Sequence, residues 1–318
     1  MKIKRKSFWV VILFLLAMVF SACGKKGQDT DLKPTTSPTA SVESEVTKEP
    51  TVSEEAEQVT DPAERKELRI VSFSPSITEL IYALDASEYL VGRTVYCDYP
   101  EAALTVESIG DFYTPDIEKI ITLEPDLIIA SSLWTDGVAQ KFEEAGIEIL
   151  LLEDISRVDD VFTIIASLGK YLDREDEATL LIEELSSDLN EVSKKVKGYE
   201  PVSVYYVVGF GEYGDMTATG DTYISEMLAM AGGDNIAKDA TGWIYSLETL
   251  VEKDPEVIII GQNLLEEFIN SPNYQNLSAV KHGNVYGIDS NLVDRQTNRI
   301  AKGISVMAHI LHPEAFEE

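Results

Sequence analysis

Short apolar runs alternate with helix-length segments from residue 68 to the end of the chain. Runs rich in Val and Ile that are spaced in this way are typical of buried parallel strands with a helix between successive strands. The pattern predicts seven strands, at residues 69–74, 90–94, 127–131, 147–152, 202–208, 257–261 and 285–289. These features indicate the α/β class.

Capping residues mark two helix starts. Ser76 and Glu79 have the spacing of a capping box, in which each side chain bonds the backbone N–H of the other residue. Thr114, Pro115 and Asp116 supply an N-cap, a proline at the first helical position and an acid at the second. We therefore expect helices to begin at these two places.

A pattern of thirteen residues occurs twice, at an offset of 130 positions. Residues 117–129 and 247–259 agree in their apolar, acidic and proline positions. Each copy predicts an acidic first helical turn, a helix, an acid followed by proline, and a buried strand. The agreement favours duplication of one lobe, although two unrelated α/β units can resemble each other by chance.

A long amphipathic stretch lies between the two copies. Apolar residues recur at spacings of three and four from about residue 174 to 197, with no Gly or Pro before Gly198. Some 22 helical residues would reach about 33 Å. Such a helix would join two lobes more rigidly than loops could. We predict an N-terminal lobe at 68–172, a bridging helix at 173–198 and a C-terminal lobe at 199–318.

The N-terminus has the pattern of an export signal. Four basic residues precede an apolar run at 8–20, which is too short to cross a bilayer comfortably and typical of a signal peptide. Small residues directly before Cys23 resemble a bacterial lipobox, which predicts a signal peptide at 1–22 and lipidation at Cys23. The alternative is an ordinary secretory signal with an incidental cysteine. The first interpretation places the protein outside the cytoplasm, anchored to the cell membrane as a lipoprotein.

Residues 23–67 are rich in Thr, Ser, Pro and Glu, a composition that predicts a disordered linker. The charge of the chain lies mainly beyond this linker, because residues 68–318 carry 16 basic and 45 acidic side chains, a net charge of −29. That balance argues against nucleic acid as a partner. Three histidines make a His-built metal site improbable.

Motifs for catalysis are weak or absent in this sequence. It contains no GxSxG, HExxH or P-loop pattern, and we expect no enzyme activity. Residues 209–214 fit the glycine pattern of a dinucleotide-binding loop, but the residues that follow do not continue as a helix. We therefore interpret this segment as a flexible loop.

Several motifs together resemble a known family over roughly residues 68–311. They are the segments 69–79, 96–100, 117–127 and 231–235, with Trp243 followed by Ser246, Leu247 and Glu248. Their order is similar to that in the helical-backbone substrate-binding proteins of ABC importers for ferric siderophores, haem and cobalamin. The resemblance implies two Rossmann-like lobes joined by one long backbone helix, the class III periplasmic-binding-protein fold.

The family resemblance also implies partners. The expected ones are a metal-chelate ligand, an ABC permease dimer with its ATPase, and the membrane through the N-terminal lipid; the protein itself would be a monomer. No cofactor or metal site of its own is expected, because cobalt or iron would arrive within the ligand. Glu118 and Glu248 would each dock one lobe on a permease subunit. The alternative is that each acid only complements the positive end of its helix, worth about 0.3–1 kcal/mol.

Ligand contacts are expected on loops at the carboxyl ends of strands. Position relative to these loops and to the family's motifs selects eight residues: Tyr96, Asp98, Phe112, Tyr113, Trp134, Trp243, Tyr245 and Arg295. The flat aromatic faces would suit a macrocycle or an aromatic chelate. The alternative for any one aromatic residue is that it packs in the core or at the rim.

Charge bears on the choice of ligand. Catecholate siderophore complexes are strongly anionic and need clustered Arg or Lys, whereas only Arg93, Arg295 and Arg299 lie near the expected loops. Cobalamin or another corrinoid is therefore the first prediction, and a ferric siderophore or haem is the second. A third hypothesis, from another class, is an extracellular enzyme or sensor on the same two-lobe fold.

Overall fold

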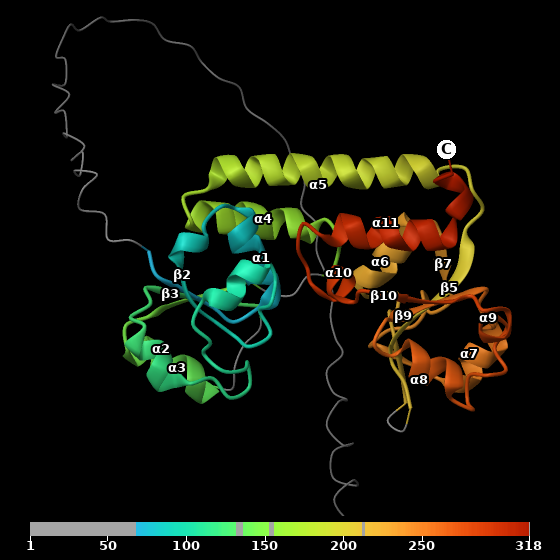
Figure 1. Ribbon diagram of the computed structural model, residues 1–318, viewed down its shortest axis with the longest axis horizontal. Helices are drawn as coiled ribbons and strands as arrows, with labels where there is room; N and C mark the ends of the chain where they lie inside the picture. The colour runs from blue at the N-terminus through green and yellow to red at the C-terminus, as the bar shows by residue number, and fades with distance from the viewer. Residues whose placement is uncertain (1–67, 132–135, 153–155, 212–213, 318) are drawn as a thin grey trace, which may run out of the picture. The chain divides into compact units, whose positions relative to one another are not determined.

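The computed structural model describes residues 68–131, 136–152, 156–211 and 214–317, and these belong to one compact unit (Figure 1). The predicted signal peptide, Cys23, the linker at 23–67 and Trp134 lie outside the described residues. Within the described part, no helix is both long enough and apolar enough to cross a membrane.

The first sheet has four parallel strands in the order β2-β1-β3-β4. Parallel neighbours need a crossover connection, and helices supply the crossovers here. The strands are β1 (Ile70–Ser72), β2 (Leu90–Arg93), β3 (Leu127–Ala130) and β4 (Glu148–Leu151). The helices of this part are α1 (Pro75–Ala83), α2 (Ile117–Thr122), α3 (Asp136–Glu144) and α4 (Asp160–Tyr171).

The second sheet combines parallel and antiparallel strands in the order β10-β9-β5-β6-β8, with β7 paired to β5. Its parallel strands are β5 (Val202–Gly209), β7 (Gly233–Asn235), β9 (Val257–Gly261) and β10 (Val285–Ile288), and its antiparallel strands are β6 (Asp215–Thr217) and β8 (Ile244–Tyr245). The helices are α6 (Tyr223–Met230), α7 (Leu247–Lys253), α8 (Leu265–Asn270), α9 (Ser278–His282), α10 (Asn291–Asp294) and α11 (Ile300–Leu311).

All seven predicted strands are confirmed, with small differences at their ends. Strands β6, β7 and β8 were not predicted, because each has only two or three residues and no run of that length shows a periodicity. Strand β6 follows the glycine-rich segment at 209–214 and pairs antiparallel with β5. The absence of a helix at this point, expected from the sequence, is therefore confirmed.

The two copies of the repeat have the same local structure. Helices α2 and α7 each lead into a buried strand, and each turn between them contains an acid in the left-handed region, Glu124 at φ 48° and Asp254 at φ 41°. The caps are Asp116, which accepts from the Lys119 N–H, and Ser246. The predicted N-cap at Thr114 is wrong by two positions, because Asp111 holds Thr114 in the preceding turn.

Helix α5 (Glu175–Val196) is the predicted bridging helix, and its 22 residues correspond to about 33 Å. It packs against α4 and α11, which lie beside it along much of its length (Figure 1). The predicted stripe is buried at Leu181, Leu185, Leu189 and Val192. The same hydrophobic cluster includes residues of both sheets, so the helix contributes to a shared core. The lobe boundaries at 172 and 199 stay a prediction.

Helix α1 begins at Pro75 and has no side-chain cap, so the predicted capping box at Ser76 and Glu79 is wrong. The Glu79 carboxylate is buried and accepts hydrogen bonds from Arg295 and Arg299 instead. A long-range ion pair has replaced the local backbone contact that the spacing predicts.

Candidate functional site

A cavity of about 720 Å³ is lined by residues of both sheets and their loops. Most of its lining follows the carboxyl end of a strand: Ser74 and Ser76 after β1, Ser131 after β3, Ser156 after β4, Val208 at the end of β5, and Asn291, Asp294, Arg295 and Gln296 after β10. Open α/β sheets bind ligands at this edge, and the volume is in the range of small-molecule sites. This cavity is the candidate binding site.

Of the predicted ligand residues that the structure describes, two line this cavity, and Trp243 is one of them. Its backbone is in the left-handed region, at φ 68°, which is unusual for a bulky residue. The Trp243 N–H donates to Thr219 Oγ1 at 3.1 Å, and the Gly242 N–H donates to Asp221 at 3.0 Å. The Thr219 hydroxyl and the Gly242 N–H lower the pKa of the Asp221 carboxyl. These contacts hold the turn that places Trp243 on the cavity wall.

Arg295 is the other predicted residue in the lining, and its guanidinium is already paired. It donates to Glu79 Oε1 and to Asp98 Oδ1, both at 2.7 Å. Asp98 and Tyr96 lie on the loop after β2 and do not line the cavity, although the Tyr96 side chain is 54% exposed. The structure thus brings Asp98 and Arg295 together as an ion pair.

Three other predicted aromatic residues that the structure describes, Phe112, Tyr113 and Tyr245, lie elsewhere. Phe112 packs against the core of the first sheet and forms an edge contact with Tyr113, whose own side chain is 84% exposed. Tyr245 is buried, its hydroxyl donates to the Ile236 carbonyl at 3.1 Å, and its ring lies beside Tyr205. The position of Tyr245 therefore corresponds to the core alternative, and none of these three residues lines the cavity.

Polar residues form most of the wall, and the sequence motifs did not point to them. Ser74, Asp221, Asn291 and Asp294 were not predicted, because the family's motifs and the search for flat contact faces favoured aromatic residues. A usable signal was present, since Ser74 and Ser76 flank a proline directly after β1 and a polar segment follows β10. Position after a strand predicts such residues better than residue type does.

Among the described lining residues, Arg295 is the only basic one, and Asp221 and Asp294 are acidic. The two other arginines near these loops are also paired: Arg93 is buried and donates to backbone carbonyls, and Arg299 binds Glu79. The described wall thus offers no unpaired guanidinium to an anionic ligand. It suits a neutral or cationic ligand held by hydroxyl and amide groups.

Glu118 and Glu248 occupy equivalent places in the first turns of α2 and α7. Both side chains are exposed, and among the described residues neither forms an ion pair. Each is therefore accessible to a partner.

Asp215 on β6 is buried near Glu248 and accepts a hydrogen bond from the Tyr274 hydroxyl. Burial raises the pKa of the Asp215 carboxyl, the Tyr274 hydroxyl opposes this, and the charge of Glu248 raises the pKa further.

The raised pKa of Asp215 predicts a pH-dependent stability. As pH rises above the ordinary pKa of a carboxyl, the unfolded chain ionises first, and the folded wild type loses stability. We expect Asp215→Asn to gain stability relative to wild type between about pH 4 and pH 7. Urea unfolding of both proteins across this pH range tests the prediction. A difference in their free energies of unfolding that stays constant with pH would contradict it.

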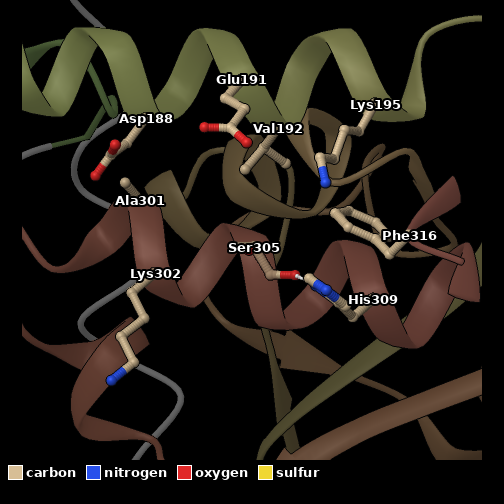
Figure 2. A pocket seen from close by; sticks show the side chains of 9 residues that line it. All are labelled: Asp188, Glu191, Val192, Lys195, Ala301, Lys302, Ser305, His309 and Phe316. Carbon is tan, nitrogen blue, oxygen red and sulfur yellow. Dashed lines mark hydrogen bonds between the residues drawn. The ribbon is translucent and has the colours of Figure 1, made fainter. Parts of the chain in front are cut away.

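A second cavity, of about 430 Å³, lies between α5 and α11 (Figure 2). His309 stacks on Phe316 at 3.6 Å between ring centroids, and Lys195 lies over the same Phe316 ring. None of the predicted ligand residues that the structure describes lines this cavity, whose lining comes from α5, α11 and Phe316. Within the described residues, no group of three or more His, Cys, Asp or Glu side chains could hold a metal ion.

Comparison with known proteins gives consistent matches. The sequence pattern of the family described as "Periplasmic binding protein" matches residues 70–292. The ABC transporter substrate-binding lipoprotein YvrC of Bacillus subtilis, itself uncharacterized, is 30% identical over 333 aligned positions, 99% of each chain. A vitamin B12-binding protein of Yersinia pestis is 30% identical over 198 positions, 60% of this chain and 69% of that protein.

Solved structures match the fold. The vitamin B12-binding protein BtuF of Vibrio cholerae is 26% identical, with a TM-score of 0.65, and the match covers 79% of this chain and 98% of that one. The haem-binding protein RhuT of Roseiflexus sp. RS-1 has a TM-score of 0.71 over 79% of this chain and 100% of that one. At 22% identity, this second match shows the fold alone. The matches confirm the class III fold expected from the sequence.

Proposed function

The chain belongs to the periplasmic binding protein family, and from this premise we propose that it captures a corrinoid such as cobalamin and delivers it to an ABC permease. As a member of this family it is a substrate-binding component of transport and not an enzyme. Any cobalt would arrive within the ligand as cargo. Capture needs only the cavity, closure around the ligand and docking, with no bond made or broken.

One observation carries the choice of ligand: the described cavity wall has no unpaired cation. Binding a multiply charged catecholate there would require Arg295 to leave Glu79 and Asp98, and separating a partly buried ion pair is costly. A corrinoid needs hydrogen-bond partners and flat apolar contacts instead. The hydrogen-bond partners can come from the serine hydroxyls, Asn291 and Gln296 of the wall, and the flat apolar contact can come from Trp243.

The relatives support the same choice. Vitamin B12-binding proteins are among the relatives at 30% identity, whereas the haem-binding structures with TM-scores near 0.7 are below 25% identity. The relative named as a lipoprotein supports anchoring through Cys23. We further propose that Glu118 and Glu248 dock the two lobes on the permease, because they are exposed and occupy equivalent positions.

Calorimetric titration of the purified protein tests the ligand. We expect a submicromolar Kd for cyanocobalamin and binding at least about tenfold weaker for a ferric catecholate complex, equivalent to about 1.4 kcal/mol. Haemin and a ferric hydroxamate complete the panel. Submicromolar binding of haemin or a siderophore without binding of cyanocobalamin would reject the corrinoid.

A further inference from the structure

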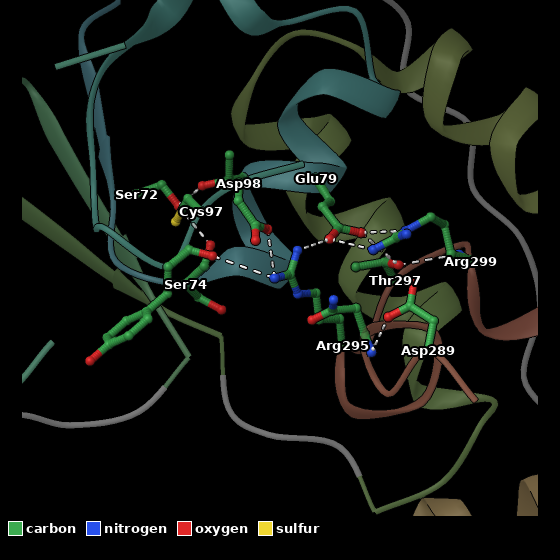
Figure 3. A network of polar contacts seen from close by, with 12 residues as sticks. Ser72, Ser74, Glu79, Cys97, Asp98, Asp289, Arg295, Thr297 and Arg299 are labelled. Atoms are coloured by element: carbon green, nitrogen blue, oxygen red, sulfur yellow. Dashed lines mark hydrogen bonds and ion pairs between the residues drawn. The ribbon is translucent and has the colours of Figure 1, made fainter. Parts of the chain in front are cut away.

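Glu79 on α1 is a buried carboxylate, 3% exposed, whose partners come from a distant segment of the chain. Its Oε1 accepts from Arg295 Nη1 at 2.7 Å and from Arg299 Nη2 at 2.6 Å. Its Oε2 accepts from Arg299 Nε at 2.7 Å and from Thr297 Oγ1 at 3.3 Å. Arg299 therefore binds in the two-pronged geometry that gives the strongest carboxylate pairs. Figure 3 shows the three donor residues, Arg295, Thr297 and Arg299, converging on Glu79.

Each of these two arginines also contacts the loop after β2, residues 96–99. Arg295 Nη2 donates to Asp98 Oδ1 at 2.7 Å and to the Tyr96 carbonyl at 3.5 Å. The Arg299 guanidinium lies over the Tyr99 ring, 3.9 Å from its centroid, in a cation–π contact. The loop thus depends on two cations that are themselves held by one carboxylate.

The cluster is balanced in charge, with two arginines against Glu79 and Asp98. Its arginine side chains are only 11% and 16% exposed, so solvent screens them weakly. Removing the Glu79 charge would leave two poorly solvated cations with one exposed acid. The arginines would then reorient, and the 96–99 loop and the cavity wall at Arg295 would change together.

We infer that Glu79 is a positioning residue for ligand capture. It does not line the cavity, but through Arg295 and Arg299 it sets the 96–99 loop of the first lobe against the 294–296 wall of the second. This inference rests on the proposed function for its affinity readout. A second readout needs no ligand: Cys97 lies within the loop, is fully buried and contacts Thr94 Oγ1 at 3.2 Å. Loss of the loop's position would expose this thiol.

The test compares Glu79→Gln with two controls in the full-length protein. Glu101→Gln removes an exposed acid close to the same loop. Leu189→Ala truncates a buried residue of α5 outside the cluster and is expected to lower thermal stability. We expect Glu79→Gln to raise the rate of Cys97 alkylation by iodoacetamide, followed by peptide mass spectrometry, by about tenfold. The Kd for cyanocobalamin should rise by about tenfold as well, the effect of losing one charge-assisted contact. Both controls should stay within about twofold of wild type.

Asp98→Asn is a second variant in case Glu79→Gln does not fold. Because Asp98 is exposed, this change breaks one ion pair at the surface and leaves the buried Glu79 carboxylate paired with Arg299. We expect Cys97 to react about threefold faster than in wild type. Equal Cys97 alkylation rates in Asp98→Asn, Glu101→Gln and wild type would overturn the inference. It would also be overturned if Glu79→Gln and Leu189→Ala, compared at the same loss of Tm, raised the alkylation rate equally. If wild type binds no cyanocobalamin but the alkylation rates change as expected, the proposed ligand fails and the positioning role stands.

Discussion

Charge reversal at both Glu118 and Glu248 is expected to reduce ligand uptake by at least about tenfold while the Kd of the ligand changes less than about twofold. The two acids are exposed, lie in the first turns of α2 and α7, and do not line the cavity. If the two acids dock on a basic permease surface as proposed, reversal would turn two attractive contacts into repulsive ones, and delivery would fail although capture would not. Uptake in cells that depend on this protein and calorimetry on the purified variant measure the two steps separately.

The matched control reverses one exposed acid in each lobe at other places, Glu143 on α3 and Glu252 on α7. This pair changes the net charge of the protein by the same amount. A specific docking role predicts nearly normal uptake in the control. If both pairs reduced uptake equally, general steering by the acidic surface would explain the result, and if neither did, the docking proposal would be wrong.

Trp243→Ala is expected to weaken ligand binding by about tenfold to hundredfold. Trp243 is the aromatic residue that the described turn, held by Thr219 and Asp221, places on the cavity wall. Large aromatic residues in desolvated sites contribute most of the binding energy in many interfaces, and truncation of one costs about 2 kcal/mol or more. Calorimetry with cyanocobalamin measures the change without relying on tryptophan fluorescence.

Two aromatic residues outside the cavity lining provide the comparison. Tyr245→Phe removes a hydroxyl that bonds the Ile236 carbonyl, and it should lower stability by about 1 kcal/mol with little effect on Kd. Tyr113→Ala removes a side chain that is 84% exposed. A larger loss of affinity in either variant than in Trp243→Ala would place the ligand against the first lobe's rim or the core face of the second sheet.

The repeat shows which elements of secondary structure a local sequence pattern can predict. Residues 117–129 and 247–259 predict a helix, a turn and a buried strand, and the structure confirms them in both copies. Helix α5 is confirmed for the same reason, because its apolar stripe repeats over many turns. The prediction failed where a feature was too short to have a period, as in β6 and β8, or where one residue had two available partners, as in Glu79.

By itself the sequence determined seven of the ten described strands, the long bridging helix, the two equivalent acids and the edge of the sheets where a site would lie. Those features depend on the spacing of neighbouring residues, which the chain carries locally. Only the tertiary structure decided that Trp243 lines the cavity while Tyr245 is buried, and that Arg295 is paired with Glu79 and Asp98. These partners are about two hundred positions apart in the chain. Whether an arginine is free for a ligand depends on packing between distant segments, and the spacing of neighbouring residues does not predict such contacts.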